Sequence, residues 1–477
     1  MQLGIDIGMC YSKAIFVLDG KVTFIKDPVQ NKYIYPSSAY VNSQNAVWVG
    51  QRAEAKFLND PAHYYRYFKR DLGSNKPYPA LGKGIYPQTL IEAMLWQFKS
   101  DAEQILGSSA TTAIIAVPKS YKAQKTKSEL IQNAGKNVRF DRVELLEDAI
   151  AVAAYHDVQR GIADKEYILV YDLGGTFDAT VVQKKGRNYE CFNRSLPSEH
   201  CGGGIAFDGK IYEDLTQYIQ RVQPHLSDLL NSRNSTPEAL RLRRTLHNFC
   251  VRFKHHLSTA SEVDEHMQPG LPDSAPVAYS LTRSEFETMI ASFIEETINY
   301  CNQVVREAGL RWQDIGQVLL VGGSCHIPYV REKVEQKLHR SVTLLKDLEI
   351  AACLGTATYI TQGRSSKPDL LTALAKWTQD FLKEGERSQI PIVPVMRYVD
   401  AVNYFVKKRP PDLLIQKGAM LWQAHSRVQI FTQVFLDENS TPVYGSDGKP
   451  YGRQLIVRQF DVELRNAFGN QQLIIVE

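Results

Sequence analysis

The chain has 477 residues, of which 44% are hydrophobic and 23% are charged, a composition typical of globular proteins. Its formal net charge of +4 is small for this length and does not indicate nucleic acid or a membrane surface as a partner. At about 150 residues per folded unit, the length predicts roughly three units.

Seven cysteines are scattered along the chain and form no CxxC pair, which favours reduced thiols over a disulfide framework or a zinc site. No basic and apolar leader precedes the first apolar segment. No apolar run approaches the ~18 residues that a membrane span needs. We therefore expect a soluble, cytoplasmic protein.

The first predicted element is a β-hairpin over residues 4–20 (GIDIGMCYSKAIFVLDG), in which apolar segments flank a polar tip. Gly8 in the tip lets backbone N–H groups turn toward a ligand, and the acidic Asp6 stands just before it. Such a tip suits a phosphate with its magnesium ion. One hairpin alone is a weak indication, because many β-turns share the pattern.

Residues 51–166 predict a sheet covered by helices. We expect helices over residues 51–58, 88–106 and 122–134, and strands over residues 113–117 and 142–146. The strand at 113–117 is continuously apolar, which is typical of a strand buried on both faces.

Two charged positions in this region have alternative interpretations. Lys69 follows a run of aromatic residues and either projects from a segment packed on a surface or, more commonly, snorkels from a core segment. Glu147 is either an acid at a helix N-terminus, the commoner explanation, or a carboxylate that faces a cleft.

A second hairpin is predicted over residues 168–182 (ILVYDLGGTFDATVV), and it repeats the first. With an offset of 166 the two stretches align without a gap, so that Asp6 meets Asp172, Gly8 meets Gly174 and Tyr11 meets Phe177. Two copies in one register indicate an internal duplication. Two such hairpins facing each other across a cleft would hold one polyphosphate from both sides.

Two further glycine-rich turns follow. Residues 202–204 lead into a helix, which predicts either an anion site at the helix N-terminus or a flexible surface turn. Residues 210–262 read as helical and basic, and the interleaved apolar residues favour an amphipathic helix over a nucleic-acid surface. After a loop at 268–276 and a helix at 285–308, a buried strand at 318–321 enters a turn at 322–324 that suits a nucleoside or a phosphate.

The last part of the chain differs in character. We expect an alanine-rich helix at 350–360, a linker at 361–367, an amphipathic helix at 370–382, strands at 428–436 and 455–464, and a hairpin turn at 446–449. The predicted organisation is one lobe over 1–166, a second lobe over 167–364 and a C-terminal region over 365–477, a helix followed by β-rich segments.

Seven motifs in this order resemble the nucleotide-binding domain of the heat-shock 70-kDa (DnaK-type) chaperones, within the actin, sugar-kinase and chaperone ATPase superfamily. The likeness covers about residues 1–362. The motifs are GIDIGxxYS at 4–12, YFKRxxG at 67–73, VPxxY at 117–121, ExxxAVAAY at 147–155, DLGGTFD at 172–178, GGGIAFD at 202–208 and VGGSxxIP at 321–328.

The resemblance implies a duplicated α/β fold, with two lobes around a cleft that holds ATP or ADP, Mg²⁺ and K⁺. It implies that Asp6 and Asp172 lie beside the metal ion, and that Lys69, Glu147, Asp172, Thr176 and Asp178 take part in catalysis. The residues that it assigns to the nucleotide are Gly8, Met9, Cys10, Tyr11, Gly174, Gly175, Gly203, Gly204, Lys254, His255, Ser258, Gly322, Gly323, Ser324 and His326. It also implies a protein client or a co-chaperone as partner.

The sequence departs from the family pattern at several of these positions. Met9 and Cys10 replace paired threonines, and the triple glycine of the second hairpin is the pair Gly174 and Gly175. Asp148 replaces a proline, and His255 and His326 align with two arginines that would sandwich the base. The region 365–477 is too short for the family's peptide-binding β-sandwich and helical lid.

These features favour an ATP-binding, slowly hydrolysing, chaperone-like switch whose lobes close on ATP. The alternatives are a non-catalytic interaction module that keeps its nucleotide, and a small-molecule kinase of the same superfamily. Filament formation is the least supported.

Overall fold

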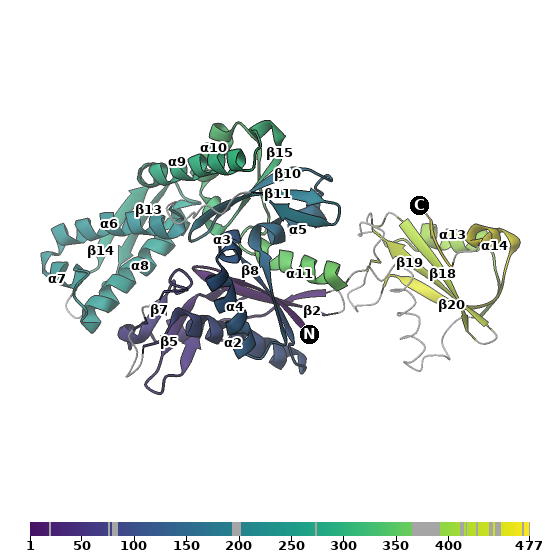
Figure 1. The fold of residues 1–477 in the computed structure, drawn as a ribbon, viewed down its shortest axis with the longest axis horizontal. Coiled ribbons are helices and arrows are strands. Elements are labelled where there is room, and N and C mark those ends of the chain that lie inside the picture. The colour runs from purple at the N-terminus through teal and green to yellow at the C-terminus, as the bar shows by residue number, and fades with distance from the viewer. Residues whose placement is uncertain are drawn as a thin grey trace. The chain divides into compact units, whose positions relative to one another are not determined.

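A computed structural model describes residues 1–18, 21–74, 77–78, 84–192, 202–271, 274–364, 392–410, 415, 417–425, 428–437, 442–443, 450–469 and 472–476. The chain divides into two compact units, Met1–Thr361 and Gln362–Glu477. Figure 1 shows the mixture of helices and strands in each unit.

The first unit contains two mixed sheets built on one plan (Figure 1). In order across the first sheet, the strands are β3 (Lys21–Phe24), β2 (Tyr11–Leu18), β1 (Gln2–Ile7), β8 (Thr112–Val117) and β9 (Arg142–Glu147). In the same order, the strands of the second sheet are β12 (Asn188–Cys191), β11 (Phe177–Lys185), β10 (Tyr167–Leu173), β15 (Ile315–Val321) and β16 (Val342–Leu344). Each sheet has a central antiparallel hairpin, two parallel strands on one side and one antiparallel strand on the other. The first sheet has a sixth strand, the short β4 (Tyr35–Pro36), which pairs with the start of β2. The predicted duplication is therefore confirmed.

The two central hairpins differ in the length of their tips. In the first, Ile7 pairs with Ser12, so four residues form the tip, whereas in the second Leu173 pairs with Phe177 and three residues form it. The gap-free alignment is therefore wrong beyond the tip, and Ser12, not Tyr11, corresponds to Phe177. The second tip, which contains the glycine pair, is one residue shorter than the first.

Helices cover both sheets and also fill the space between them. The long helices of the unit are α2 (Pro87–Leu106), α4 (Lys125–Asn137), α5 (Asp148–Arg160), α6 (Gly204–Val222), α8 (Pro237–Leu257), α9 (Arg283–Glu307), α10 (Pro328–Leu338) and α11 (Ala351–Arg364). Helices α2 and α4 share a core with one face of the first sheet, and α6, α8, α9 and α10 share one with a face of the second. Helices α5 and α11 contribute to cores with both sheets, so they lie between them.

Helix α11 packs against the first sheet, although it follows the second sheet in the chain. Its residues Cys353, Ala357 and Ile360 are buried with Ile15 of β2 and Ile114 of β8. The Cys353 thiol lies 3.9 Å from the carbonyl oxygen of Gly4. The end of the first unit thus returns to the strand with which the chain begins.

Smaller elements extend the two halves. In the first half these are β4 (Tyr35–Pro36), β5 (Ser38–Val41), β6 (Val47–Val49), β7 (Tyr64–Arg66), α1 (Gln51–Glu54), η1 (Pro61–His63) and α3 (Lys119–Ala123). In the second half they are η3 (Pro224–Leu226), α7 (Ser227–Leu230), β13 (Glu262–Met267), β14 (Val277–Thr282), η4 (Trp312–Asp314) and η5 (Gly323–His326). Strands β6, β5 and β7 form a three-stranded sheet, and β13 pairs with β14.

Several predicted boundaries need correction. The helix predicted at 51–58 ends at Glu54, and the one at 122–134 is two helices that break at Gln124, which has extended backbone angles. The continuous helix at 210–262 is also wrong, because α6, η3, α7 and α8 are separate and β13 begins at Glu262. Helix α11 runs on to Arg364, through part of the predicted linker.

The second unit is a five-stranded mixed sheet with two helices on one face. Its strands, in order, are β17 (Ile392–Met396), β20 (Gly452–Phe460), β19 (Val428–Leu436), β18 (Lys417–His425) and β21 (Leu473–Val476), and its helices are α13 (Tyr398–Lys407) and α14 (Val462–Phe468). Both helices share one core with the sheet. The strand predicted at 455–464 ends at Phe460, because Asp461 caps α14 by accepting the Leu464 amide at 2.7 Å. The helix at 370–382 and the turn at 446–449 lie outside the described residues.

Within the described part of the chain, none of the helices combines the length and the apolarity needed to cross a lipid bilayer.

Candidate functional site

The tips of the two central hairpins meet. A Cβ atom placed on Gly175 would lie 2.6 Å from Cys10 Sγ and 3.4 Å from Met9 Cβ, so a side chain at this position would collide with the opposite tip. Ser37, between β4 and β5, fixes the first tip, since its hydroxyl donates to Gly8 O at 2.8 Å and its amide donates to Cys10 O at 2.8 Å. Tyr11 begins β2 next to this tip, and Thr176 in the second tip is exposed.

Carboxylates and lysines gather behind these tips. Asp6 lies opposite Lys13 in the β1–β2 ladder and accepts a hydrogen bond from its ammonium at 3.2 Å. Asp172 lies directly opposite Asp178 in the β10–β11 ladder. Lys69 is 9% exposed, its ammonium lies over the Tyr121 ring, and its charge, like that of Lys13, favours the ionised form of Asp172.

The pKa shifts indicate an excess of negative charge. Burial and the neighbouring Asp6 raise the pKa of Asp172 to about 6, against the pull of Lys13 and Lys69. Burial, Asp178 and Asp172 raise the pKa of Asp148. Burial lowers the pKa of Lys69, although Asp6, Asp148 and Asp172 act in the opposite direction. Among the described residues, the four carboxyl groups of Asp6, Asp148, Asp172 and Asp178 are thus accompanied by only two ammonium groups, those of Lys13 and Lys69.

This charge balance fits a hydrated magnesium ion. Within the described residues, no group of three His, Cys, Asp or Glu side chains is arranged to hold a metal ion directly. Mg²⁺ usually keeps several waters and binds one or two carboxylates together with substrate phosphates. Asp6 and Asp172 would therefore hold the ion through its waters, and its charge would offset their repulsion.

Three glycine turns pack together: the tip of the second hairpin, the turn at 202–204 and the turn at 322–324. The Gly204 amide donates to Gly174 O at 2.9 Å, and the Ser324 hydroxyl donates to the same oxygen at 3.1 Å. A Cβ atom on Gly204 would lie 2.5 Å from Ser324 Oγ. The Gly204 amide is therefore used inside the protein, where it joins this turn to the second hairpin tip.

Gly322 precedes the third turn, and Gly323 begins η5 there. Gly322 has φ +88°, a left-handed conformation, and its Cα lies so close to Leu173 that a Cβ would be 2.4 Å from the Leu173 carbonyl carbon. Only glycine can both adopt this left-handed conformation and leave room for the Leu173 backbone. The end of β15 is thereby held against the end of β10.

The residues predicted for the base lie around the end of α8. Lys254 is buried, forms an ion pair with Asp208 at 2.8 Å and donates to Gly204 O at 3.1 Å. Partial burial and the positive charges of Lys254 and His256 lower the pKa of His255 to about 4, so its imidazole is neutral at pH 7. The positive charge of His326 also lowers the pKa of His255. The Ser258 hydroxyl donates to Lys254 O at 3.1 Å.

Sequence reasoning missed three charged residues of this region. Lys13 could have been found by pairing the two strands around a four-residue tip, which sets it opposite Asp6. Asp148 stood out only as a departure from the family pattern. No motif in the sequence marks Arg66, because its place beside the first tip depends on the pairing of β7 with β5. The predicted Glu147 precedes α5, and its carboxylate interacts with the Cys191 thiol.

The two halves also touch away from the tips. Tyr67 Oη lies 3.2 Å from Nε2 of His247 in α8, and Arg241 donates to Leu58 O at 2.7 Å. Arg244 donates to Tyr64 Oη at 2.9 Å. These contacts join the segment around β7 to α8.

Acid should weaken the first unit through His247. Burial and the nearby Arg244 and Arg66 lower the pKa of His247 to about 3, below the unfolded value of about 6.5. The unfolded chain then binds the extra proton, so this stability is complete above about pH 6.5 and is lost as the pH falls. We expect a loss of about 2 kcal/mol in the free energy of unfolding between pH 7 and pH 5.

Urea unfolding at the two pH values measures this loss. His247→Gln should reduce it, whereas His225→Gln, which removes an exposed histidine, should leave it as in the parent. An undiminished loss in His247→Gln would contradict the assignment.

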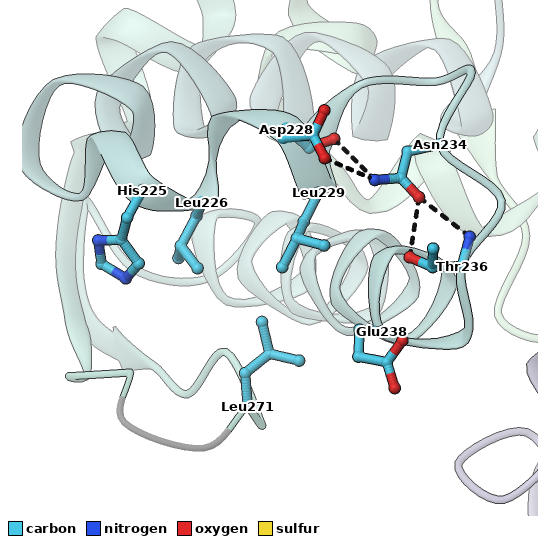
Figure 2. Close-up of a pocket in the computed structure, with 8 residues that line it drawn as sticks. All are labelled: His225, Leu226, Asp228, Leu229, Asn234, Thr236, Glu238 and Leu271. Atoms are coloured by element: carbon cyan, nitrogen blue, oxygen red, sulfur yellow. Dashed lines mark hydrogen bonds between the residues drawn. The ribbon is translucent and has the colours of Figure 1, made fainter.

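A separate hollow of about 440 Å³ lies between η3, α7 and the start of α8 (Figure 2). Its polar groups bond to one another, since Asn234 donates to Asp228 and accepts from Thr236, as the dashed lines in Figure 2 show. None of the predicted site residues lines it. The hollow therefore adds nothing to the candidate site.

Comparison with known proteins gives one family. The family model described as Hsp70 protein matches residues 77–371, more than half of the chain. The match begins after the first hairpin and Lys69, so the roles of these residues stay predictions. The match and the two sheets together show a two-lobe, actin-like ATPase fold.

Proposed function

The chain belongs to the Hsp70 family and is thus a chaperone-like ATP-binding protein, and we propose that it hydrolyses ATP slowly and closes its two lobes on the nucleotide to regulate a protein client or co-chaperone. The region that would respond is the C-terminal unit. ATP with Mg²⁺ would supply the phosphoryl chemistry, and the protein would position water and offset the developing charge.

The observation that carries this proposal is the pair of opposed hairpin tips with carboxylates and lysines behind them. Asp6 and Asp172 would hold the waters of the magnesium ion. Lys69 would neutralise charge at the terminal phosphate, and Asp178 and Glu147 would order the attacking water and a K⁺ ion. Thr176, exposed in the second tip, would face the same phosphate.

The remaining predicted residues would bind the rest of the nucleotide. The tips at residues 8–11 and 174–175 and the turn at Gly203 and Gly204 would surround the phosphates. Lys254, His255, Ser258 and His326 would surround the base, and residues 322–324 would bind the nucleoside or a phosphate. Neutral imidazoles stack on adenine, but they lack the cationic attraction that arginines would give.

One set of observations favours a second candidate, a protein that keeps its nucleotide without turnover. Met9 and Cys10 bring no hydroxyl groups to the first tip and lie directly against Gly175. Burial raises the pKa of Cys10, so its thiol stays protonated and offers only a weak hydrogen-bond donor.

A single-turnover measurement with labelled ATP and Mg²⁺ separates the two candidates. Slow release of labelled phosphate from bound ATP supports the ATPase. Tight binding without release over hours supports the non-catalytic candidate. Calorimetry that detects no binding of Mg²⁺ and ATP to folded protein would overturn both.

A further inference from the structure

Arg66, at the end of β7, lies beside the first hairpin tip. It pairs with Ser38 in the β5–β7 ladder, and Ser37, the residue before Ser38, holds that tip through Gly8 O and Cys10 O. Arg66 is therefore fixed by backbone pairing next to the turn that should face the phosphates.

The charge of Arg66 reaches both sides of this turn. Burial raises the pKa of Cys10, and Arg66 is the strongest charge that opposes the shift. Burial also raises the pKa of Asp208 in α6, and Lys254 and Arg66 oppose that shift. The guanidinium thus lies within electrostatic range of the first tip and of the helix that follows Gly203.

The guanidinium is buried, and one of its donors has no hydrogen-bond partner within the described part of the chain. Its side chain is 10% exposed, its ion pair with Glu54 is long at 4.0 Å, and its Nε has no hydrogen-bond partner among the described residues. Glu54 is shared with Arg244 at 3.8 Å, so one carboxylate serves two cations. A buried guanidinium with an unfilled donor is costly unless an anion joins it.

Tyr67 holds Arg66 in place. It has φ +58°, a left-handed conformation that few non-glycine residues adopt. Its ring lies 5.3 Å from the Arg66 guanidinium, and its hydroxyl contacts His247. Backbone strain of this kind clusters at ligand-binding sites, and Tyr67 lies between Arg66 and Lys69 in the sequence.

We infer that Arg66 binds the phosphate chain of the nucleotide and supplies the donors that Met9 and Cys10 lack. An arginine presents five N–H groups in a planar fork that matches phosphate oxygens. The inference rests on the proposed nucleotide binding. A competing interpretation is that Arg66 only joins the two halves of the unit, like Arg244, and never contacts the nucleotide.

The test compares the affinities of the full chain for ATP, ADP, AMP and adenosine by calorimetry. Arg66→Ala should weaken binding of Mg²⁺ and ATP about 10- to 100-fold, the loss expected for charge-assisted hydrogen bonds. Adenosine binding should change less than about twofold, because it has no phosphate. Arg66→Gln should show the same pattern, and thermal unfolding without nucleotide identifies the better folded of the two variants.

Arg244→Ala is the matched control, because it removes a neighbouring guanidinium whose Nη2 already donates to Tyr64 Oη, while its Nε, like that of Arg66, has no hydrogen-bond partner among the described residues. The ratio of ATP affinity to adenosine affinity should stay as in the parent. If Arg66→Ala and Arg66→Gln also keep that ratio, the inference is wrong while the proposed function stands. If the parent binds none of the four ligands, both are wrong.

Discussion

Replacing Lys69 by alanine is expected to lower the rate of ATP hydrolysis by about 10²- to 10³-fold, the usual effect of removing one preorganised electrostatic group. Lys69 is buried, and its charge interacts with those of Asp6, Asp148 and Asp172, which is why we propose that its ammonium offsets charge developing on the terminal phosphate. Binding of ATP should change by less than about tenfold, because the glycine turns and the base-binding residues are untouched. Single-turnover phosphate release and calorimetry give the two quantities.

Lys127 provides a matched control for this variant. Its ammonium also lies over the Tyr121 ring, at 4.6 Å against 5.6 Å for Lys69. Lys127→Ala should therefore hydrolyse ATP at the parent rate. Hydrolysis by Lys69→Ala at the parent rate would show that the chemistry has been assigned to the wrong residue.

Replacing Gly355 by alanine is expected to destabilise the first unit by about 3 kcal/mol, at the upper end of the range for overpacked cores. A Cβ atom on Gly355 would lie 1.9 Å from the backbone oxygen of Ala151, so α11 would have to move away from α5. That movement would open the core in which Cys353 and Ile360 meet Ile15. Urea unfolding followed by circular dichroism measures the change.

Gly209 in α6 is the control for this substitution. Nothing lies within 4 Å of a Cβ built on it, and its φ is not positive. Gly209→Ala should stabilise the protein by up to about 1 kcal/mol through helix propensity alone. A neutral Gly355→Ala would mean that the two helices are not packed backbone to backbone.

The repeated sheet plan could be predicted from the sequence, whereas the tip lengths could not. The strands of the central hairpins are apolar on both faces, as the buried run in β2 shows. A slip of one residue then exchanges one apolar side chain for another, so hydrophobic pattern cannot fix the register. The pairing of Ile7 with Ser12 is set by the backbone of the tip instead.

The sequence could predict those residues of the candidate site that belong to local motifs. Asp6, Asp172 and the glycine turns stand in such motifs, and the structure brings the two tips together. Arg66 could not be predicted, because only the pairing of β7 with β5 sets it beside the first tip. The error at α14 was avoidable, since Asp461 stands before Val462 as a typical N-cap residue.

The return of α11 to β1 constrains how the first unit forms during synthesis. The Cys353 thiol meets the Gly4 carbonyl across 349 positions of sequence. The face of the first sheet that α5 and α11 share therefore stays only partly covered until residues near Cys353 have been synthesised. Contacts so distant in sequence slow folding, and exposed apolar strands associate with one another in the meantime. A chaperone-like protein of this design would itself depend on protection while it is being made.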